Sequence, residues 1–354
     1  MAGIPDMMPL SALSIPGTHN SHTHYRALPS VRCQHVDVKT QLDNGIRFLD
    51  IRLQPVHATD TTKKDLYLVH GAFPVSLTGP KYFEPVLETC YDFLVAHPSE
   101  TILISLKREG IGNATDEHLA HILDKHYITP HSSKWYTAPW TPYLGAVRGK
   151  LILLRRYNTT VTASPATPTP TKPTTGIDAT AWPHNATHAL FPSHAPTSST
   201  QLCLQDACDL QHPTLLPTKI AHCTAHLARA ASLTHPIPGA TTDATNPVPP
   251  APLHLNFLSA SNFWNKRCWP GSVARVVNRS AEEWVCGAHH LEEGAEGGGS
   301  GGRGKRRRKG GDGGRGIVVM DWVGEGAGGW DLVRLIVGCN MGVLGKVGGE
   351  EWWW

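Results

Sequence analysis

Several features that mark other protein classes are missing from this 354-residue sequence. None of its eight cysteines forms a CxxC pair, which argues against a zinc ribbon and a thioredoxin-type redox site. No segment approaches the ~20 consecutive apolar residues that are needed to cross a bilayer. The N-terminal segment has neither the basic start nor the long apolar core of a signal peptide. The compartment therefore stays unassigned: cytoplasmic, or secreted with a leader that this chain lacks.

Charged residues are also scarce, at 17% of the chain. The net charge of +3 conceals a basic run, because residues 303–315 carry seven basic groups and one acidic group. Without that run, 25 basic groups face 28 acidic ones, so the body of the protein lacks the basic surface of a nucleic-acid-binding protein. We expect no nucleic-acid partner. Cys203 and Cys208 are close enough in sequence for a short disulfide loop, and two free thiols are an equally good interpretation.

Two segments have compositions that do not suit a packed fold. Residues 158–200 are rich in Thr, Pro, Ser and Ala, and residues 294–316 contain twelve glycines in 23 positions. Both lie between predicted strands. We therefore expect one domain, residues 1–354, with two disordered surface insertions at 158–200 and 294–316.

The remaining sequence alternates between short apolar runs and helical patterns. The runs are nearly continuous in Ile, Leu and Val, which is typical of strands buried on both faces of a parallel sheet. Strand–helix alternation of this length predicts an α/β barrel. The predicted strands are Leu13–Ile15, Ile46–Arg52, Leu66–His70, Thr101–Lys107, Leu151–Arg156, Leu253–Ser259 and Ile317–Asp321, and the helical patterns cover Tyr82–His97, Thr115–His126 and Trp330–Val337.

Four successive predicted strands end in side chains with useful chemistry. SIPGTHNSH (14–22) presents His19, LYLVHG (66–71) ends at His70, and ILISLKREG (102–110) presents Lys107. In GIRFLDIR (45–52), Asp50 and Arg52 are two residues apart and share one face of the strand. Taken singly, each has a structural interpretation, such as an ion pair between Asp50 and Arg52. The ordered set is the informative feature.

This set suits cleavage of a phosphodiester by an internal hydroxyl group. That reaction needs a base for the attacking oxygen, an acid for the leaving oxygen and a cation at the phosphoryl group. Imidazole can be base and acid because its pKa lies near neutrality. Arginine suits the phosphoryl group because its planar guanidinium matches two phosphate oxygens.

The same motifs resemble a known family. PGTHNS, GIRFLDIR, LVHG and ISLKRE, in that order, are similar to the catalytic X region of phosphatidylinositol-specific phospholipase C, most of all the bacterial and fungal single-domain type. The similarity continues in RGKLILLRRY (148–157), LQD (204–206), NFLSAS (256–261) and GIVVMDW (316–322).

The resemblance implies a distorted TIM (β/α)8-type barrel that cleaves phosphatidylinositol, or a glycosylated form, to diacylglycerol and a cyclic inositol phosphate. It implies that His19 is the general base, His70 the general acid and Arg52 the phosphate ligand. Asp321 would orient His19, and Asp50 would support the site as a further carboxylate. The positions expected to bind substrate are Asn20, Lys107, Arg156, Asp206 and Ser259.

Two departures from the family pattern matter. Asn20 stands where the bacterial enzymes have Asp, and calcium-dependent relatives use Asn there as a metal ligand. Those relatives also have a carboxylate where this chain has Arg52, whose positive charge would repel calcium. We therefore expect no metal and no cofactor. The second departure is Cys208, which replaces an aromatic residue that stacks on inositol.

Two other functions remain open from the sequence. One is a related barrel phosphodiesterase that acts on another lipid or a glycerol phosphodiester. The other is a catalytically inactive homologue that only binds lipid. For the favoured function, we expect an inositol phospholipid as substrate, transient association with a membrane surface and a monomer.

Overall fold

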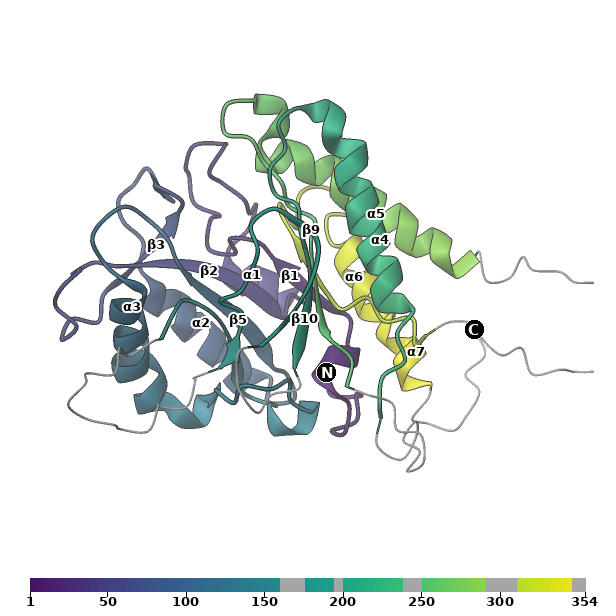
Figure 1. Ribbon diagram of the computed structural model, residues 1–354, viewed down its shortest axis with the longest axis horizontal. Coiled ribbons are helices and arrows are strands. Elements are labelled where there is room, and N and C mark those ends of the chain that lie inside the picture. The colour runs from purple at the N-terminus through teal and green to yellow at the C-terminus, as the bar shows by residue number, and fades with distance from the viewer. Residues whose placement is uncertain (160–175, 194–199, 238–249, 291–310, 346–354) are drawn as a thin grey trace, which may run out of the picture.

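The computed structural model describes residues 1–159, 176–193, 200–237, 250–290 and 311–345. A curled sheet of mostly parallel strands lies at the centre, with helices packed around it (Figure 1). The neighbouring strands follow the order β6-β7-β5-β2-β1-β12-β11-β10-β9. Their bounds are β1 Ile15–Thr18, β2 Phe48–Pro55, β5 Ile102–Arg108, β6 Trp135–Tyr136, β7 Leu151–Arg156, β9 Ala186–Pro192, β10 Gln201–Asp206, β11 Leu253–Phe257 and β12 Ile317–Met320.

Successive residues of the parallel strands enter two different cores. In β5, Leu103 packs in the cluster inside the curled sheet, whereas Ile102 and Ile104 pack in the larger cluster between the sheet and the helices. Since neighbouring side chains of a strand point to opposite faces, a strand buried on both faces must be apolar at nearly every position. This explains why the continuous apolar runs of the sequence mark these strands.

The helices follow the sequence patterns closely. α2 spans Phe83–Ala96 and α6 spans Asp331–Gly338. α3 begins at Asp116 because the Thr115 side chain accepts a hydrogen bond from the backbone of His118, and the chain continues beyond Ile122 as irregular helical turns. The other helices are α1 Val38–Asp43, α4 Leu216–Ala231, α5 Pro270–His290 and α7 Asn340–Leu344. None of the described helices is both long and apolar enough to cross a membrane.

The prediction that Leu66–His70 forms an inner barrel strand is wrong. This segment is β3 (Leu66–His70), which pairs antiparallel with β2 and with the short strand β4 (Phe73–Pro74), beside the main path of the sheet. Only residues 56–65 connect β2 to β3. A parallel connection needs a crossover of about a dozen residues or more, so the short link favours a hairpin.

The prediction of an unpacked insertion over residues 158–200 is wrong for its central part. Residues 176–193 contain β8 (Ile177–Asp178), which extends the sheet beside β7, and β9, which pairs antiparallel with β10. Asp178 donates its backbone N–H to the Ser193 hydroxyl, 3.0 Å away. The predicted disorder of 160–175 and 194–199 lies outside the described residues.

The second predicted insertion, 294–316, is also packed at its C-terminal end. Asp312 and Arg315 are buried, and the Arg315 guanidinium lies over the Trp284 ring of α5, 5.1 Å from the ring centre. Arg315 also donates its backbone N–H to Ser14, just before β1. These contacts fix the entry to β12, so residues 311–316 belong to the fold. Residues 294–310 lie outside the described part of the chain.

Candidate active site

The candidate residues gather at the C-terminal ends of the parallel strands. His19 directly follows β1, and Asp321 directly follows β12. These two strands pair in parallel, with Thr18 opposite Met320. Arg52 lies in the second half of β2, and His70 ends the hairpin strand β3. The parallel arrangement therefore brings polar side chains from both ends of the sequence to one edge of the sheet.

The turn after β1 holds His19 rigidly. Within β1, Gly17 is required because a Cβ atom at this position would lie 2.8 Å from the Cβ atom of Phe48 on β2. The Gln34 side chain donates to the backbone oxygen of His19 at 2.7 Å. Asn20 adopts a left-handed backbone conformation with φ of 42°, which is unusual for a residue other than glycine and common at functional sites.

His19 and Asp321 form the hydrogen bond that the sequence predicts. His19 Nδ1 lies 2.9 Å from Asp321 Oδ1, and only 2% of the Asp321 side chain is exposed. Burial lowers the pKa of His19, but the charges of Asp321 and Cys33 outweigh burial and raise this pKa well above its ordinary value. The other ring nitrogen, Nε2, lies 3.2 Å from the side-chain nitrogen of Asn20.

The two candidate histidines face each other across a buried cysteine. The ring centres of His19 and His70 are 6.2 Å apart, and the rings are nearly perpendicular. His70 Nδ1 lies 2.7 Å from the backbone oxygen of Val31 and 3.8 Å from Cys33 Sγ. Burial lowers the pKa of His70, but the Cys33 sulfur outweighs it and raises this pKa. Burial raises the pKa of Cys33, but the two imidazoles bring it down to about 7.

Arg52 is held between two carboxylates. Its guanidinium donates to Asp50 Oδ2 at 2.9 Å and also to Glu109 Oε1. Burial raises the pKa of Asp50, but the charges of Arg52 and Arg156 outweigh burial and hold this pKa far below its ordinary value. Glu109 also accepts from Lys107 at 2.7 Å and from the backbone of Gly71. The guanidinium is thus fixed in orientation before any phosphate arrives.

Three cations form a row across neighbouring strands. The register pairs Arg52 of β2 with Lys107 of β5, and Lys107 with Arg156 of β7. Arg156 reaches Asp50 at 3.4 Å, so the first and third cations share one carboxylate. A row of cations at a sheet edge attracts an anionic group such as a phosphodiester.

Arg156 also belongs to a second cluster. Its guanidinium lies 3.8 Å from the centre of the Trp182 ring, and the Trp182 indole N–H donates to Asp206 at 2.9 Å. Asp206 ends β10, so these contacts join β7 to β10 across the site. Ser259 is buried two residues beyond β11, and within the described residues no hydrogen bond ties it to the other candidates.

Sequence reasoning missed Cys33 and Trp182. Cys33 lies in a loop without periodicity, so nothing in its local pattern separates it from a structural thiol. Trp182 was hidden inside the segment interpreted as an insertion, although a lone tryptophan in a Thr/Pro-rich stretch is a usable signal of packing. Of the two interpretations of Cys203 and Cys208, the structure has the one with free thiols.

The geometry does not suit a calcium ion at the Arg52 position. Calcium takes about six to eight oxygen ligands. Both Asp50 oxygens already accept from Arg52, and Oδ1 also accepts from Arg156. Asn20 Oδ1 is a buried oxygen without a hydrogen-bond partner in the described residues, but two guanidinium groups beside Asp50 would repel a divalent cation. His19, Cys33 and Asp321 are close enough to one another to hold a softer metal.

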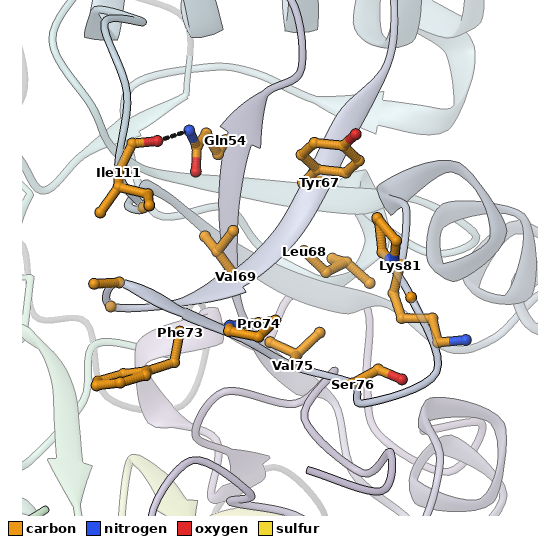
Figure 2. Close-up of a pocket in the computed structure, with 15 residues that line it drawn as sticks. Gln54, Tyr67, Leu68, Val69, Phe73, Pro74, Val75, Ser76, Lys81 and Ile111 are labelled. Atoms are coloured by element: carbon orange, nitrogen blue, oxygen red, sulfur yellow. Dashed lines mark hydrogen bonds between the residues drawn. The ribbon is translucent and has the colours of Figure 1, made fainter. Parts of the chain in front are cut away.

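An apolar pocket lies beside this site, along the β3–β4 hairpin (Figure 2). It has a volume of about 370 Å³, and its lining includes Gly71, Phe73, Val75 and Ile111. Gly71, in the turn of the hairpin, lines the pocket and directly follows His70. Phe73 also stacks on Phe263, which does not line the pocket, with ring centres 4.6 Å apart.

Comparisons of the fold and sequence agree with this geometry. The chain has the barrel fold of phosphatidylinositol-specific phospholipase C: a crystal structure of the Staphylococcus aureus enzyme superposes with a TM-score of 0.66 at 21% identity, covering 96% of this chain and 95% of that protein. The predicted distorted TIM-type barrel is thereby confirmed. Residues 7–157 match the family described as phosphatidylinositol-specific phospholipase C, X domain. This match covers the N-terminal part of the chain, which contains His19, Arg52 and His70.

Two curated relatives show how far the sequence similarity extends. The 1-phosphatidylinositol phosphodiesterase of Listeria monocytogenes is 34% identical over 171 residues, which are 45% of this chain and 49% of that protein. The human PI-PLC X domain-containing protein 1 is 28% identical over 141 residues, 32% of this chain and 42% of the relative. The matched part of the chain thus spans about half the length of these relatives.

Proposed function

We propose that this protein is a phosphodiesterase that cleaves phosphatidylinositol, or a glycosylated phosphatidylinositol, by paired histidines and without a metal ion. One observation carries the proposal: His19 and His70 face each other 6.2 Å apart, beside a guanidinium that is fixed by two carboxylates. The names of the relatives agree with this reaction class.

His19 is the general base. With Nδ1–H donating to Asp321, the lone pair of the imidazole is on Nε2. Nε2 takes the proton of the inositol 2-hydroxyl while that oxygen forms its bond to phosphorus. The Asp321 carboxylate stabilises the imidazolium that results, as carboxylates do in other acid–base pairs.

His70 is the general acid. Its Nδ1–H donates to the Val31 backbone oxygen, so the proton that it delivers is on Nε2. This proton goes to the glycerol oxygen as its bond to phosphorus breaks. The products are diacylglycerol and a cyclic inositol phosphate. The raised pKa of His70 keeps the imidazole protonated when it is needed.

Arg52 binds the phosphoryl oxygens. Asp50 and Glu109 hold its guanidinium in place, so little rearrangement is needed when charge develops on phosphorus. The negative charges of these two carboxylates also reduce the net charge of the cluster, and Lys107 and Arg156 restore it. The site thus supplies fixed positive charge where calcium-dependent relatives use an ion.

The inositol ring lies against the cluster of Arg156, Trp182 and Asp206. These side chains offer donors, an acceptor and an aromatic face to a ring of hydroxyl groups. Asn20 and Ser259 lie on the same edge of the sheet and complete the expected pocket. Cys208 offers no aromatic face, and Trp182 is the aromatic side chain that the site has beside Arg156.

The lipid chains lie on the side of the β3–β4 hairpin. The leaving group must be near His70, and the next residue, Gly71, lines the apolar pocket. Phe73, Phe263 and Trp264 form an aromatic rim beside it, with Trp264 89% exposed. Exposed indole rings favour the membrane–water interface, which suits an enzyme that visits a bilayer surface.

The alternatives are less well supported by these residues. A phosphodiesterase that depends on a divalent cation needs a carboxylate pair free to bind it, whereas Asp50 and Glu109 are occupied by guanidinium and ammonium groups. An inactive homologue would be expected to lack one catalytic group, whereas His19, His70, Arg52 and Asp321 are all present and adjacent.

The test is incubation of the protein with phosphatidylinositol in mixed micelles, followed by ³¹P NMR. We expect the resonance of a five-membered cyclic phosphodiester to appear, and His19→Gln and His70→Gln to abolish it. Glycerophosphocholine and sphingomyelin, offered as substrates in parallel assays, distinguish the alternative phosphodiesterases. Specific binding of phosphatidylinositol vesicles without any product would support the inactive homologue instead.

A further inference from the structure

A second cluster of histidine and cysteine side chains lies on the outer face of the sheet, outside the candidate active site. His188 is on β9, Cys203 on β10 and His226 on α4. The strand neighbours Leu202 and Leu204 of Cys203 pack inside the barrel, so Cys203 itself points outward. The cluster therefore does not share the chamber of His19, and its role does not depend on the proposed reaction.

The potential ligand atoms of this cluster are close together. One nitrogen of each histidine and the Cys203 sulfur all lie within 4.8 Å of one another. Cys203 Sγ is 3.9 Å from His188 Nδ1. Given usual zinc–sulfur and zinc–nitrogen bond lengths, ligand atoms of a tetrahedral zinc ion are roughly 3.3–3.6 Å apart. Side-chain rotations would close the remaining gap.

His226 supplies an independent reason to expect a ligand. Its side chain is fully buried, and within the described residues its Nε2 atom makes no hydrogen bond of good geometry, although the ring interacts with the Cys203 backbone. A buried nitrogen without a well-formed hydrogen bond costs up to about 1–3 kcal/mol. Coordination of a metal ion would satisfy this atom.

His254 is a candidate fourth ligand. The register of the parallel strands places it directly opposite Cys203, and its ring centre is 5.2 Å from that of His226. Its Nδ1 lies 3.1 Å from the Pro252 backbone oxygen. Donation from Nδ1 leaves the lone pair on Nε2, which is the arrangement that orients metal-binding histidines in other proteins.

Arg229 is the group that opposes metal binding. Its guanidinium lies 3.4 Å from His226 Nδ1 and carries a positive charge. When a metal binds Nε2, the ring proton moves to Nδ1, so this contact has to break. Arg229 is only partly buried, and its side chain can move toward solvent.

We propose that His188, Cys203 and His226, with His254 as the fourth ligand, bind one zinc-class divalent ion that joins β9 and β10 to α4. Histidine nitrogen and thiolate sulfur are the ligands that Zn²⁺ and Co²⁺ prefer, and two to three histidines with one cysteine fit a tetrahedral ion. β9 is the last strand in the order of the sheet, and the ion would connect this edge strand to α4.

The experiment is a Co²⁺ titration of the full chain after chelation and desalting under reducing conditions. We expect one tightly bound equivalent with a near-ultraviolet thiolate-to-cobalt band, which Zn²⁺ removes by displacement. Cys203→Ser loses that band. The matched controls Cys33→Ser and Cys208→Ser keep it, which separates this site from the two other clusters that contain these thiols.

Two further variants distinguish loss of a metal ligand from loss of the fold. His188→Gln, at an exposed strand position, weakens Co²⁺ binding at least tenfold while circular dichroism stays unchanged. Arg229→Met tightens it because a like charge is removed. Zn²⁺ raises the Tm of the unmodified chain and leaves that of Cys203→Ser unchanged. An unmodified chain without the thiolate band, or a band that survives in Cys203→Ser, would overturn the proposal.

Discussion

Residues 1–157 and residues 176–345 both supply strands to the same sheet, but they give the candidate active site different kinds of side chain. The first region contributes both facing histidines and the row of Arg52, Lys107 and Arg156. The second contributes Asp321, which hydrogen-bonds His19, and the Trp182–Asp206 pair beside Arg156. The comparison teaches that the candidate reacting groups lie within the family match, together with the carboxylates that hold Arg52, whereas the partner of the candidate base comes from the far end of the chain.

The largest effect is expected in the first region, at the two histidines. General acid–base catalysis contributes about 10²–10⁴-fold for each group, so His19→Gln and His70→Gln should each lower kcat by roughly 10⁴-fold. The measurement is steady-state turnover of phosphatidylinositol in micelles. The matched control is His184→Gln, whose side chain is 79% exposed, and its turnover should equal that of the unmodified protein.

Arg52 should rank next. Arg52→Lys keeps the charge but loses the two-pronged contact, and we expect kcat to fall about 10²–10³-fold. Arg52→Asp should abolish turnover in EDTA, and added Ca²⁺ should then restore part of it, because Asn20 and Asp50 become available as oxygen ligands. Full activity of Arg52→Lys would show that the two-pronged contact of Arg52 with the phosphoryl group is not needed for the reaction.

Asp321 tests the supporting role of the second region through pH. We expect Asp321→Asn to lower kcat/KM by roughly 10²-fold at neutral pH. The base must be deprotonated, so activity rises as pH passes the pKa of His19. The Asp321 carboxylate raises this pKa, and its removal should move the acidic limb of the profile to lower pH. Cys33→Ser should move it in the same direction. An unchanged limb in both variants would mean that another group is the base.

The smallest effect should be at the aromatic rim. Trp264→Ala should weaken binding to phosphatidylinositol vesicles about tenfold, a loss that corresponds to ~1.4 kcal/mol. Turnover of a soluble short-chain substrate should not change, because Trp264 touches no reacting group. Trp140→Ala is the control, since Trp140 is also exposed but lies outside the rim. Equal losses on vesicles and on the soluble substrate would contradict an interfacial role.

The sequence predicted the parallel strands and placed the candidate site residues at their ends, because both features follow from local pattern. A strand buried on both faces must be apolar throughout, and its polar end residue is then conspicuous. β9 escaped prediction because it is an edge strand inside a Thr/Pro-rich stretch, and its residues are only half-buried or exposed, so it lacks the apolar run that marks the buried strands. The pairing of β3 depended on a hairpin, and Cys33 and Trp182 are placed by tertiary contacts that no local pattern records.

The central claim is that fixed guanidinium charge replaces a metal ion at the phosphoryl group. The most direct test is the initial rate of phosphatidylinositol cleavage before and after exhaustive treatment with EDTA. We predict the same rate at 25 °C, because Asp50 and Glu109 are already neutralised by Arg52 and Lys107. A loss of rate that Zn²⁺ alone restores would arise from metal removal at the outer histidine–cysteine cluster and not from the phosphoryl site. Activity that vanishes with EDTA and returns with Ca²⁺ would contradict the account and would make Asn20 a metal ligand.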